Sequence, residues 1–141
     1  MRALVVEKNE AGETRAGVQE VSEDHLPPGD VTVAVDYSTL NYKDGLCTGS
    51  GGGLVKVWPH VPGVDFAGTV EKSGDARYRP GDKVILGGWR VGEIWWGGFA
   101  QKACVRADWL MPRPKGLTTR QALAGGAAGQ SARLAGIALE D

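Results

Sequence analysis

Glycine is the feature of this sequence that most restricts its fold. The chain has 22 glycines among 141 residues, gathered mainly at positions 49–53, 87–88, 97–98 and 125–129, and this is about twice the usual share. Their spacing is not periodic, so they form neither a repeat nor a linker. Because glycine adopts positive φ angles and lets two backbones approach closely, the clusters predict many tight turns. Many turns in a short chain favour short strands and a β-rich body.

Composition excludes several classes of protein. A chain of 141 residues is long enough for one domain of ordinary size. Sixteen basic residues against 17 acidic ones leave no basic surface for nucleic acid. No apolar run is long enough to span a membrane, and the first residues lack the features of a signal peptide. The only two cysteines, Cys47 and Cys104, cannot form a disulfide framework, so we expect a cytoplasmic protein with free thiols.

Hydrophobic patterning places the expected strands. From Val31 to Asp36 apolar and polar residues alternate, which is the period of a half-buried strand. The strands expected from such patterns and from the turns between them are residues 2–7, 17–21, 31–36, 66–70, 83–86, 99–105 and 109–111. We expect the second strand to pair with the first, and a helical turn to begin near Thr39 and reach Cys47.

The last part of the chain changes character. Thr118 and Gln121 have the spacing of a capping box, in which each side chain satisfies a free backbone N–H at a helix start. Residues 119–139 are rich in alanine and leucine and predict helix. The glycines within 125–129 interrupt this pattern, and each costs about 1 kcal/mol relative to alanine inside a helix. The sequence therefore predicts two helical pieces rather than one.

Neither a phosphate-binding loop nor a metal cluster is visible. The glycines at 49–53 lack the Gly-Lys-Ser/Thr ending of a P-loop, and no strand precedes those at 125–129. No βαβ unit fits anywhere, so we expect no dinucleotide-binding domain within this chain. His25 and His60 lie far apart and outside any Cys/His cluster, so we expect no zinc site.

Two segments are candidates for a functional site. Residues 37–44 (Tyr-Ser-Thr-Leu-Asn-Tyr-Lys-Asp) place several polar groups directly after the clearest strand. Their simplest interpretation is a solvated turn in which Lys43 pairs with Asp44. Residues 87–98 combine glycines with Trp89, Trp95 and Trp96. This second segment is interpreted either as the wall of a pocket or as an aromatic lid on the core.

Several motifs, in the right order, resemble a known family. Residues 62–70 (PGVDFAGTV) and 78–84 (YRPGDKV) are similar to the N-terminal, GroES-like domain of medium-chain dehydrogenases/reductases. Within that superfamily, the chain is most similar to the quinone-oxidoreductase-like branch that includes acryloyl-CoA reductases. The segments that carry this similarity are residues 37–46, 88–93 and 96–98. The match runs from about residue 1 to residue 123. It implies a mainly β, GroES-like, partly open barrel with a C-terminal helical segment and no Rossmann domain.

The resemblance also implies a chemistry. Members of this branch are zinc-independent oxidoreductases, and Asn41 and Val64 stand here where zinc alcohol dehydrogenases carry metal ligands. NADPH is the expected cofactor, with hydride transferred to a 2-enoyl-CoA, such as acryloyl-CoA, or to a quinone. The catalytic candidates by resemblance are Asn41, Tyr42, Asp65 and Trp89. Of these, Tyr42 and Asn41 are expected to touch the cofactor, and Asp65 and Trp89 to shape the substrate side.

The resemblance weakens near residue 126. Ala127, Gln130 and Arg133 differ from the hydroxyl and apolar residues that the family shows there. We therefore expect a GroES-like domain over residues 1–117 and an altered helical tail over 118–141. The hypothesis is an excised or engineered domain that is monomeric, inactive alone and unable to hold NADPH tightly. A non-catalytic scaffold or binding module, or a split-enzyme subunit that needs a Rossmann partner, is the alternative.

Overall fold

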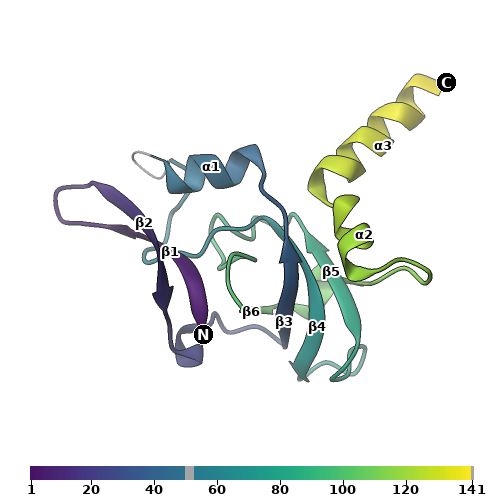
Figure 1. The fold of residues 1–141 in the computed structure, drawn as a ribbon, viewed down its shortest axis with the longest axis horizontal. Coiled ribbons are helices and arrows are strands. Elements are labelled where there is room, and N and C mark those ends of the chain that lie inside the picture. Colours follow the sequence, from purple (N-terminus) through teal and green to yellow (C-terminus); the bar gives the residue numbers. More distant parts are fainter. Residues whose placement is uncertain (50–52, 141) are drawn as a thin grey trace.

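Two antiparallel β-sheets form the body of the protein in the computed structural model, which describes residues 1–49 and 53–140. The larger sheet has five strands in the order β6-β3-β4-β5-β7, and the smaller sheet pairs β1 with β2. The strands are β1 (Arg2–Lys8), β2 (Thr14–Glu20), β3 (Val31–Ser38), β4 (Asp65–Ser73), β5 (Lys83–Gly87), β6 (Lys102–Val105) and β7 (Leu110–Pro112). The helices are α1 (Tyr42–Thr48), α2 (Thr119–Ala124) and α3 (Ala127–Glu140), with short 3₁₀ turns at Glu23–His25 and Ala107–Trp109. The sheets are open, and the expected mainly β fold is confirmed (Figure 1).

The core follows from the two-residue period of the strands. Phe66 and Val70 on β4 and Val84 and Leu86 on β5 belong to the main cluster of buried apolar residues. Ile85 faces the other side of the sheet, where it packs with Ala122 and Leu123 of α2. Helix α2 therefore covers one face of the larger sheet, whereas the main core fills the other face.

The expected pairing of the first two strands is confirmed, with Arg2 opposite Glu20 and Lys8 opposite Thr14. The observed strand β6 is shorter than the strand expected over residues 99–105, because it begins only at Lys102. Just before it, the chain turns to β1, where Leu4 N–H donates to the Phe99 carbonyl at 2.8 Å and Gln101 N–H to the Arg2 carbonyl at 3.0 Å. This segment thus joins the two sheets.

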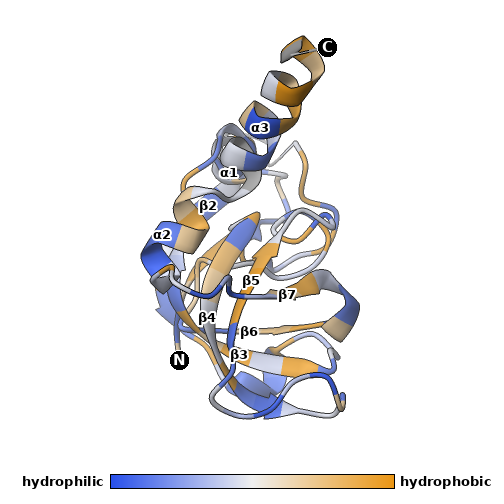
Figure 2. Cartoon of the chain, turned by 90° about the vertical axis from the view of Figure 1, so that its right-hand side faces the viewer, coloured by the Kyte–Doolittle hydropathy of each residue, from blue (hydrophilic) through white to orange (hydrophobic). Residues whose placement is uncertain are grey.

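The C-terminal part consists of two helices, as predicted. At the start of α2, Thr118 accepts a hydrogen bond from Gln121 N–H, and the Gln121 side chain accepts one from Thr118 N–H, so the capping box is present. Helix α2 ends at Ala124, with Gly125 as its C-cap residue, and α3 starts at Ala127. Helix α3 projects away from the sheets and carries both apolar and polar residues (Figures 1 and 2). Gln130 and Arg133 are exposed on it, while the side chain of Ala127 lies outside the described part of the structure.

Candidate functional site

Two of the four predicted site residues meet in one hydrogen-bond network at the edge of β4. Asp65, the first residue of that strand, is fully buried. Its carboxylate accepts hydrogen bonds from Thr39 N–H at 3.1 Å and from Thr39 Oγ1 at 2.7 Å. The Asn41 amide donates to Thr39 Oγ1 at 3.0 Å and to Asp65 Oδ2 at 3.4 Å. Asp65 therefore fixes the polar segment that follows β3.

This network explains where helix α1 begins. Thr39 was expected to start a helical turn, but its N–H and hydroxyl are both directed to Asp65. The helix starts three residues later, with Asn41 as its N-cap residue. The turn was therefore predicted correctly in kind but placed too early.

Asp44 anchors α1 to a distant loop. One of its carboxylate oxygens accepts from Gly63 N–H and Val64 N–H, each at 3.1 Å, and the other accepts from Asn41 N–H at 2.8 Å. Burial raises the pKa of Asp44, and these hydrogen bonds act in the opposite direction. The predicted Lys43–Asp44 ion pair was wrong. Asp44 turns inward to these backbone N–H groups, whereas Lys43 reaches Glu93 at 2.7 Å.

The other two predicted residues are exposed. Tyr42 is 84% exposed on the first turn of α1, and Trp89 is 59% exposed in the loop after β5. Trp89 and Arg90 both have φ angles of 58°, a conformation that costs energy for residues other than glycine. The Trp89 ring stacks on Trp109, with the ring centroids 6.4 Å apart. An outward-facing ring on a strained loop is consistent with a binding wall.

The remaining tryptophans of this loop serve the core. Trp95 packs edge-on against Trp109 at 5.2 Å and donates from its indole N–H to the Cys104 carbonyl at 2.8 Å. Trp96 donates to the Pro59 carbonyl at 3.1 Å. Trp95 is therefore part of a lid on the core. Trp95 and Trp96 also line a cavity of about 700 Å³, whereas the wall role of the exposed Trp89 stays a prediction.

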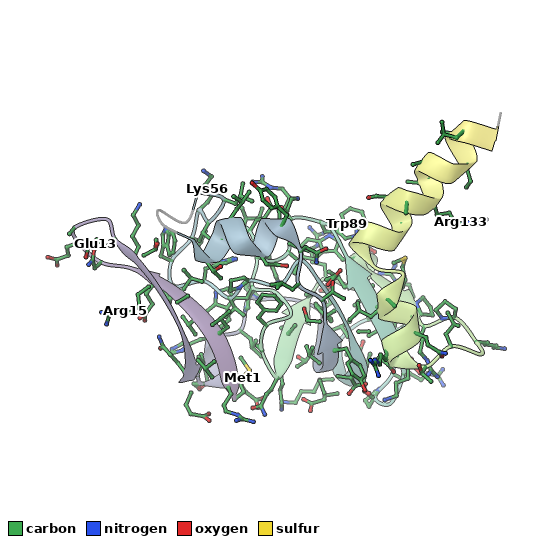
Figure 3. All side chains as sticks on the ribbon, turned by 45° about the horizontal axis from the view of Figure 1, so that its top comes forward. Met1, Glu13, Arg15, Lys56, Trp89 and Arg133 are labelled. Carbon is green, nitrogen blue, oxygen red and sulfur yellow. The ribbon has the colours of Figure 1, made fainter. Side chains whose placement is uncertain are left out.

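The break between α2 and α3 lies against the same network. A Cβ atom at Gly126 would come within 2.8 Å of Asp65 Oδ2, so a side chain there would displace the carboxylate. The start of α3 is thus next to the Asn41–Asp65 pair. Beyond this start, α3 projects away from the sheets and carries Arg133 (Figure 3).

The cysteines and histidines give no sign of a metal site. Cys47 is buried, and burial raises the pKa of its thiol to about 11, so the thiol is protonated at neutral pH. Cys104 is half-buried. His60 is buried and His25 is exposed. Over residues 1–49 and 53–140 no three His, Cys, Asp or Glu side chains are grouped so as to hold a metal ion.

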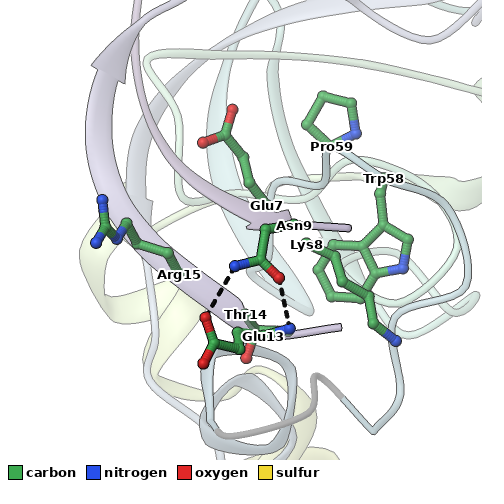
Figure 4. Close-up of a pocket in the computed structure, with 8 residues that line it drawn as sticks. All are labelled: Glu7, Lys8, Asn9, Glu13, Thr14, Arg15, Trp58 and Pro59. Atoms are coloured by element: carbon green, nitrogen blue, oxygen red, sulfur yellow. Dashed lines mark hydrogen bonds between the residues drawn. The ribbon is translucent and has the colours of Figure 1, made fainter. Parts of the chain in front are cut away.

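A separate cavity of about 900 Å³ lies at the β1–β2 hairpin (Figure 4). Its lining includes Lys8, whose ammonium group lies 5.9 Å from the centre of the Trp58 ring, and Asn9, which is hydrogen-bonded to Glu13. Sequence reasoning did not find this cavity, because a hairpin and a loop about 50 residues apart form it. None of the four predicted site residues lines it.

The comparison with known families agrees with this architecture. The family model described as "Alcohol dehydrogenase GroES-like domain" matches residues 27–115. The chain belongs to this family. Within the described residues, no helix is both long and apolar enough to cross a membrane.

Relatives of this GroES-like domain include known reductases. The chain is 67% identical over 140 residues to acrylyl-CoA reductase AcuI of Ruegeria pomeroyi, and this covers 99% of the chain and 42% of the relative. It is 40% identical over 139 residues to the putative quinone oxidoreductase YhfP of Bacillus subtilis, covering 99% of the chain and 42% of the relative. The resemblance to the quinone-oxidoreductase-like branch is thereby confirmed, and the chain spans about two fifths of these relatives. The expected end of the match near residue 123 was wrong, because both alignments cover 99% of the chain.

Similar structures have also been solved. The yhdH oxidoreductase of Salmonella enterica, in complex with NADP, has a TM-score of 0.92 and 48% identity, covering 100% of this chain and 43% of that one. Escherichia coli yhdH with bound NADPH has a TM-score of 0.92 and 49% identity, covering 99% of this chain and 43% of that one.

Proposed function

We propose that this chain supplies the substrate-facing, GroES-like part of a zinc-independent, NADPH-dependent reductase of 2-enoyl-CoA or quinone substrates. The observation that carries the proposal is the group of Asn41, Thr39 and Asp65 beside the exposed Tyr42, in a chain 67% identical to an acrylyl-CoA reductase. The proposed domain covers residues 1–117, and residues 118–141 form the helical connection.

The residues around the start of α1 suit a flat, polar ring. The Tyr42 ring is 84% exposed and offers an aromatic face and a hydroxyl group, and the half-buried Asn41 offers an amide. A nicotinamide ring carries a carboxamide that pairs with such groups. When bound, NADPH supplies a hydride for the β-carbon of the enoyl thioester or for the quinone, and a proton completes the reduction.

The chain's own side chains would hold the substrate. As negative charge develops on a thioester or quinone oxygen, nearby hydrogen-bond donors stabilise it, and the Tyr42 hydroxyl is the candidate donor. The Asn41 amide donates to Thr39 and Asp65, so its proposed role is to shape the site beside Tyr42. Trp89 would form the opposite wall. Asp65 is fully buried, so its proposed role is to orient Thr39 and Asn41 rather than to touch the substrate.

Positioning would supply much of the rate, because holding two reactants in a reactive geometry replaces a collision between free molecules. We do not expect the chain alone to hold NADPH tightly, since it contains no βαβ unit over the residues that the structure describes. A Rossmann partner would then provide the rest of the nucleotide site. A non-catalytic scaffold or a split-enzyme subunit that needs a Rossmann partner is the second candidate.

A chimera tests the proposal. This chain replaces the matching segment of the Ruegeria pomeroyi relative, and NADPH oxidation is followed with acrylyl-CoA and, separately, with a benzoquinone. We expect acrylyl-CoA reduction within about tenfold of the parent enzyme, and a loss of at least about tenfold in kcat/KM for Asn41→Leu. Tyr37→Phe, a change on β3 outside the network, is the control and should have little effect.

The competing hypotheses give different results. A folded chimera that binds NADPH but reduces neither substrate would refute the enzymatic proposal and favour the scaffold. Activity restored by mixing this chain with the separately produced remainder of the enzyme would identify it as a split-enzyme subunit.

A further inference from the structure

An ion pair with a buried carboxylate joins the two proposed walls of the site. Lys43 Nζ lies 2.7 Å from Glu93 Oε1, and Arg90 Nε lies 3.5 Å from Glu93 Oε2. Glu93 is only 6% exposed, although the side chains of Lys43 and Arg90 are 54% and 59% exposed. Lys43 belongs to the first turn of α1, whereas Glu93 belongs to the loop after β5.

The burial of Glu93 distinguishes the Lys43–Glu93 ion pair from ion pairs whose two partners are both exposed. Exposed ion pairs contribute little, because water screens them. Burial raises the pKa of Glu93, but the hydrogen bonds and charges of Lys43 and Arg90 outweigh it, and the pKa lies below its ordinary value. The carboxylate is therefore ionised at neutral pH, and removing Lys43 would leave a poorly compensated charge.

A second contact shows that one face of α1 is fixed to the loop. The Cys47 thiol donates to the Gly92 carbonyl at 3.3 Å. Cys47 and Lys43 are four residues apart, so they lie on the same face of the helix. This face of α1 contacts two consecutive loop residues, Gly92 and Glu93.

The same elements carry the exposed aromatic rings. Tyr42 directly precedes Lys43, and Trp89 directly precedes Arg90. Both Trp89 and Arg90 have left-handed backbone angles, which persist only where surrounding contacts impose them. Because Lys43 and Arg90 both contact the Glu93 carboxylate, that carboxylate links the main chain next to Tyr42 with the main chain next to Trp89.

We propose that Glu93 is a positioning residue that, through Lys43, holds α1 and the Trp89 loop in a fixed relation, so that Tyr42 and Trp89 face one substrate. This inference rests on the proposed reductase function. Glu93 itself, being buried, touches neither substrate nor cofactor in this arrangement.

Kinetics of the chimera described above test the proposal. Glu93→Gln and Lys43→Met should each lower kcat per folded protein about tenfold, because small misplacements of reacting groups have large effects on rate. We expect the KM for NADPH to change less than about twofold, and the double variant to be no worse than either single variant. Lys43→Arg, which keeps the charge, should restore most of the activity.

Glu71→Gln is the matched control. Glu71 lies 2.8 Å from the ammonium group of Lys102, in an ion pair between β4 and β6, so its loss should leave kcat and KM unchanged. If Glu93→Gln behaves like this control in an active chimera, the positioning role is refuted while the reductase function stands. An inactive but folded parent chimera refutes the function instead.

A measurement on the chain alone separates positioning from activity. The Gly92 N–H donates to the Trp95 carbonyl at 2.7 Å, and the Val91 N–H donates to the Gly88 carbonyl at 3.1 Å. In Glu93→Gln, hydrogen exchange of these two amides should be about tenfold faster, with no change in the amides of β4. Unchanged protection of the loop would overturn the proposal.

Discussion

Replacing His60 by methionine should remove a pH dependence of stability without weakening the fold at neutral pH. His60 is fully buried, and within residues 1–49 and 53–140 neither of its ring nitrogens has a hydrogen-bond partner. Burial lowers the pKa of the ring, whereas the Gly92 backbone, which comes near the ring without hydrogen-bond geometry, acts in the opposite direction. Leaving buried polar atoms unpaired costs about 1–3 kcal/mol. Methionine is apolar and adapts to irregular spaces, so His60→Met should be equally stable or more stable at pH 7.5.

The direction of the pH effect follows from the lowered pKa. The unfolded chain takes up a proton near pH 6.5, whereas the folded chain does so only at lower pH. Below pH 6.5 the unfolded state therefore binds more protons, and the free energy of unfolding falls by at most about 1.4 kcal/mol per pH unit until the folded pKa is reached. His60→Met should lack this contribution.

Urea unfolding, followed by tryptophan fluorescence at pH 7.5, 6.5 and 5.5, measures the difference. We expect the advantage of His60→Met over the original chain to grow as the pH falls. His25→Met is the control, because His25 is exposed and this variant keeps the buried His60. Equal losses of stability in His60→Met and the original chain between pH 7.5 and 5.5 would show that the ring is not held neutral by burial.

Two further substitutions test the framework of the site. Asp44→Asn should lower the free energy of unfolding by about 2–3 kcal/mol, since an amide cannot replace both charged acceptor oxygens that meet Gly63, Val64 and the start of α1. Urea unfolding at pH 7 measures this free energy, and a loss below about 0.5 kcal/mol would contradict the role of Asp44 in anchoring α1. Gly68→Ala should destabilise by more than about 3 kcal/mol or prevent folding, because the new Cβ would lie 2.0 Å from the Ala34 carbonyl oxygen. Gly17→Ala meets nothing within 4 Å and should change the melting temperature little; similar melting of the two alanine variants would refute this explanation.

Local patterns predicted the elements well because the physical causes are local. Alternation from Val31 gave β3, and the Thr118–Gln121 spacing gave the start of α2. The order of strands in the larger sheet was not predictable in this way, because pairs such as β3 with β6 join residues about 70 apart. Only the family resemblance supplied the fold as a whole.

The site was predictable as a segment but not as a set of contacts. Asn41 and Asp65 were both singled out, and the structure brings them together. Thr39, which bridges them, had no distinctive sequence signal. The Lys43–Asp44 pair was wrong because adjacent residues on a helix do not face each other. The partners that decide both orientations, Gly63 and Glu93, lie about 20 and 50 residues further along the chain.

The glycines at the centre of the molecule bring two stretches of main chain into direct contact. A Cβ at Gly97 would lie 2.2 Å from the Gly63 carbonyl oxygen, and one at Gly63 would lie 2.6 Å from the Gly98 nitrogen. A side chain at either glycine would collide with main-chain atoms, so the two stretches of backbone would have to move apart. In relatives that act on other substrates, we therefore expect the exposed aromatic residues at positions 42 and 89 to vary. We expect glycine to persist at positions 63 and 97, where the two backbones touch.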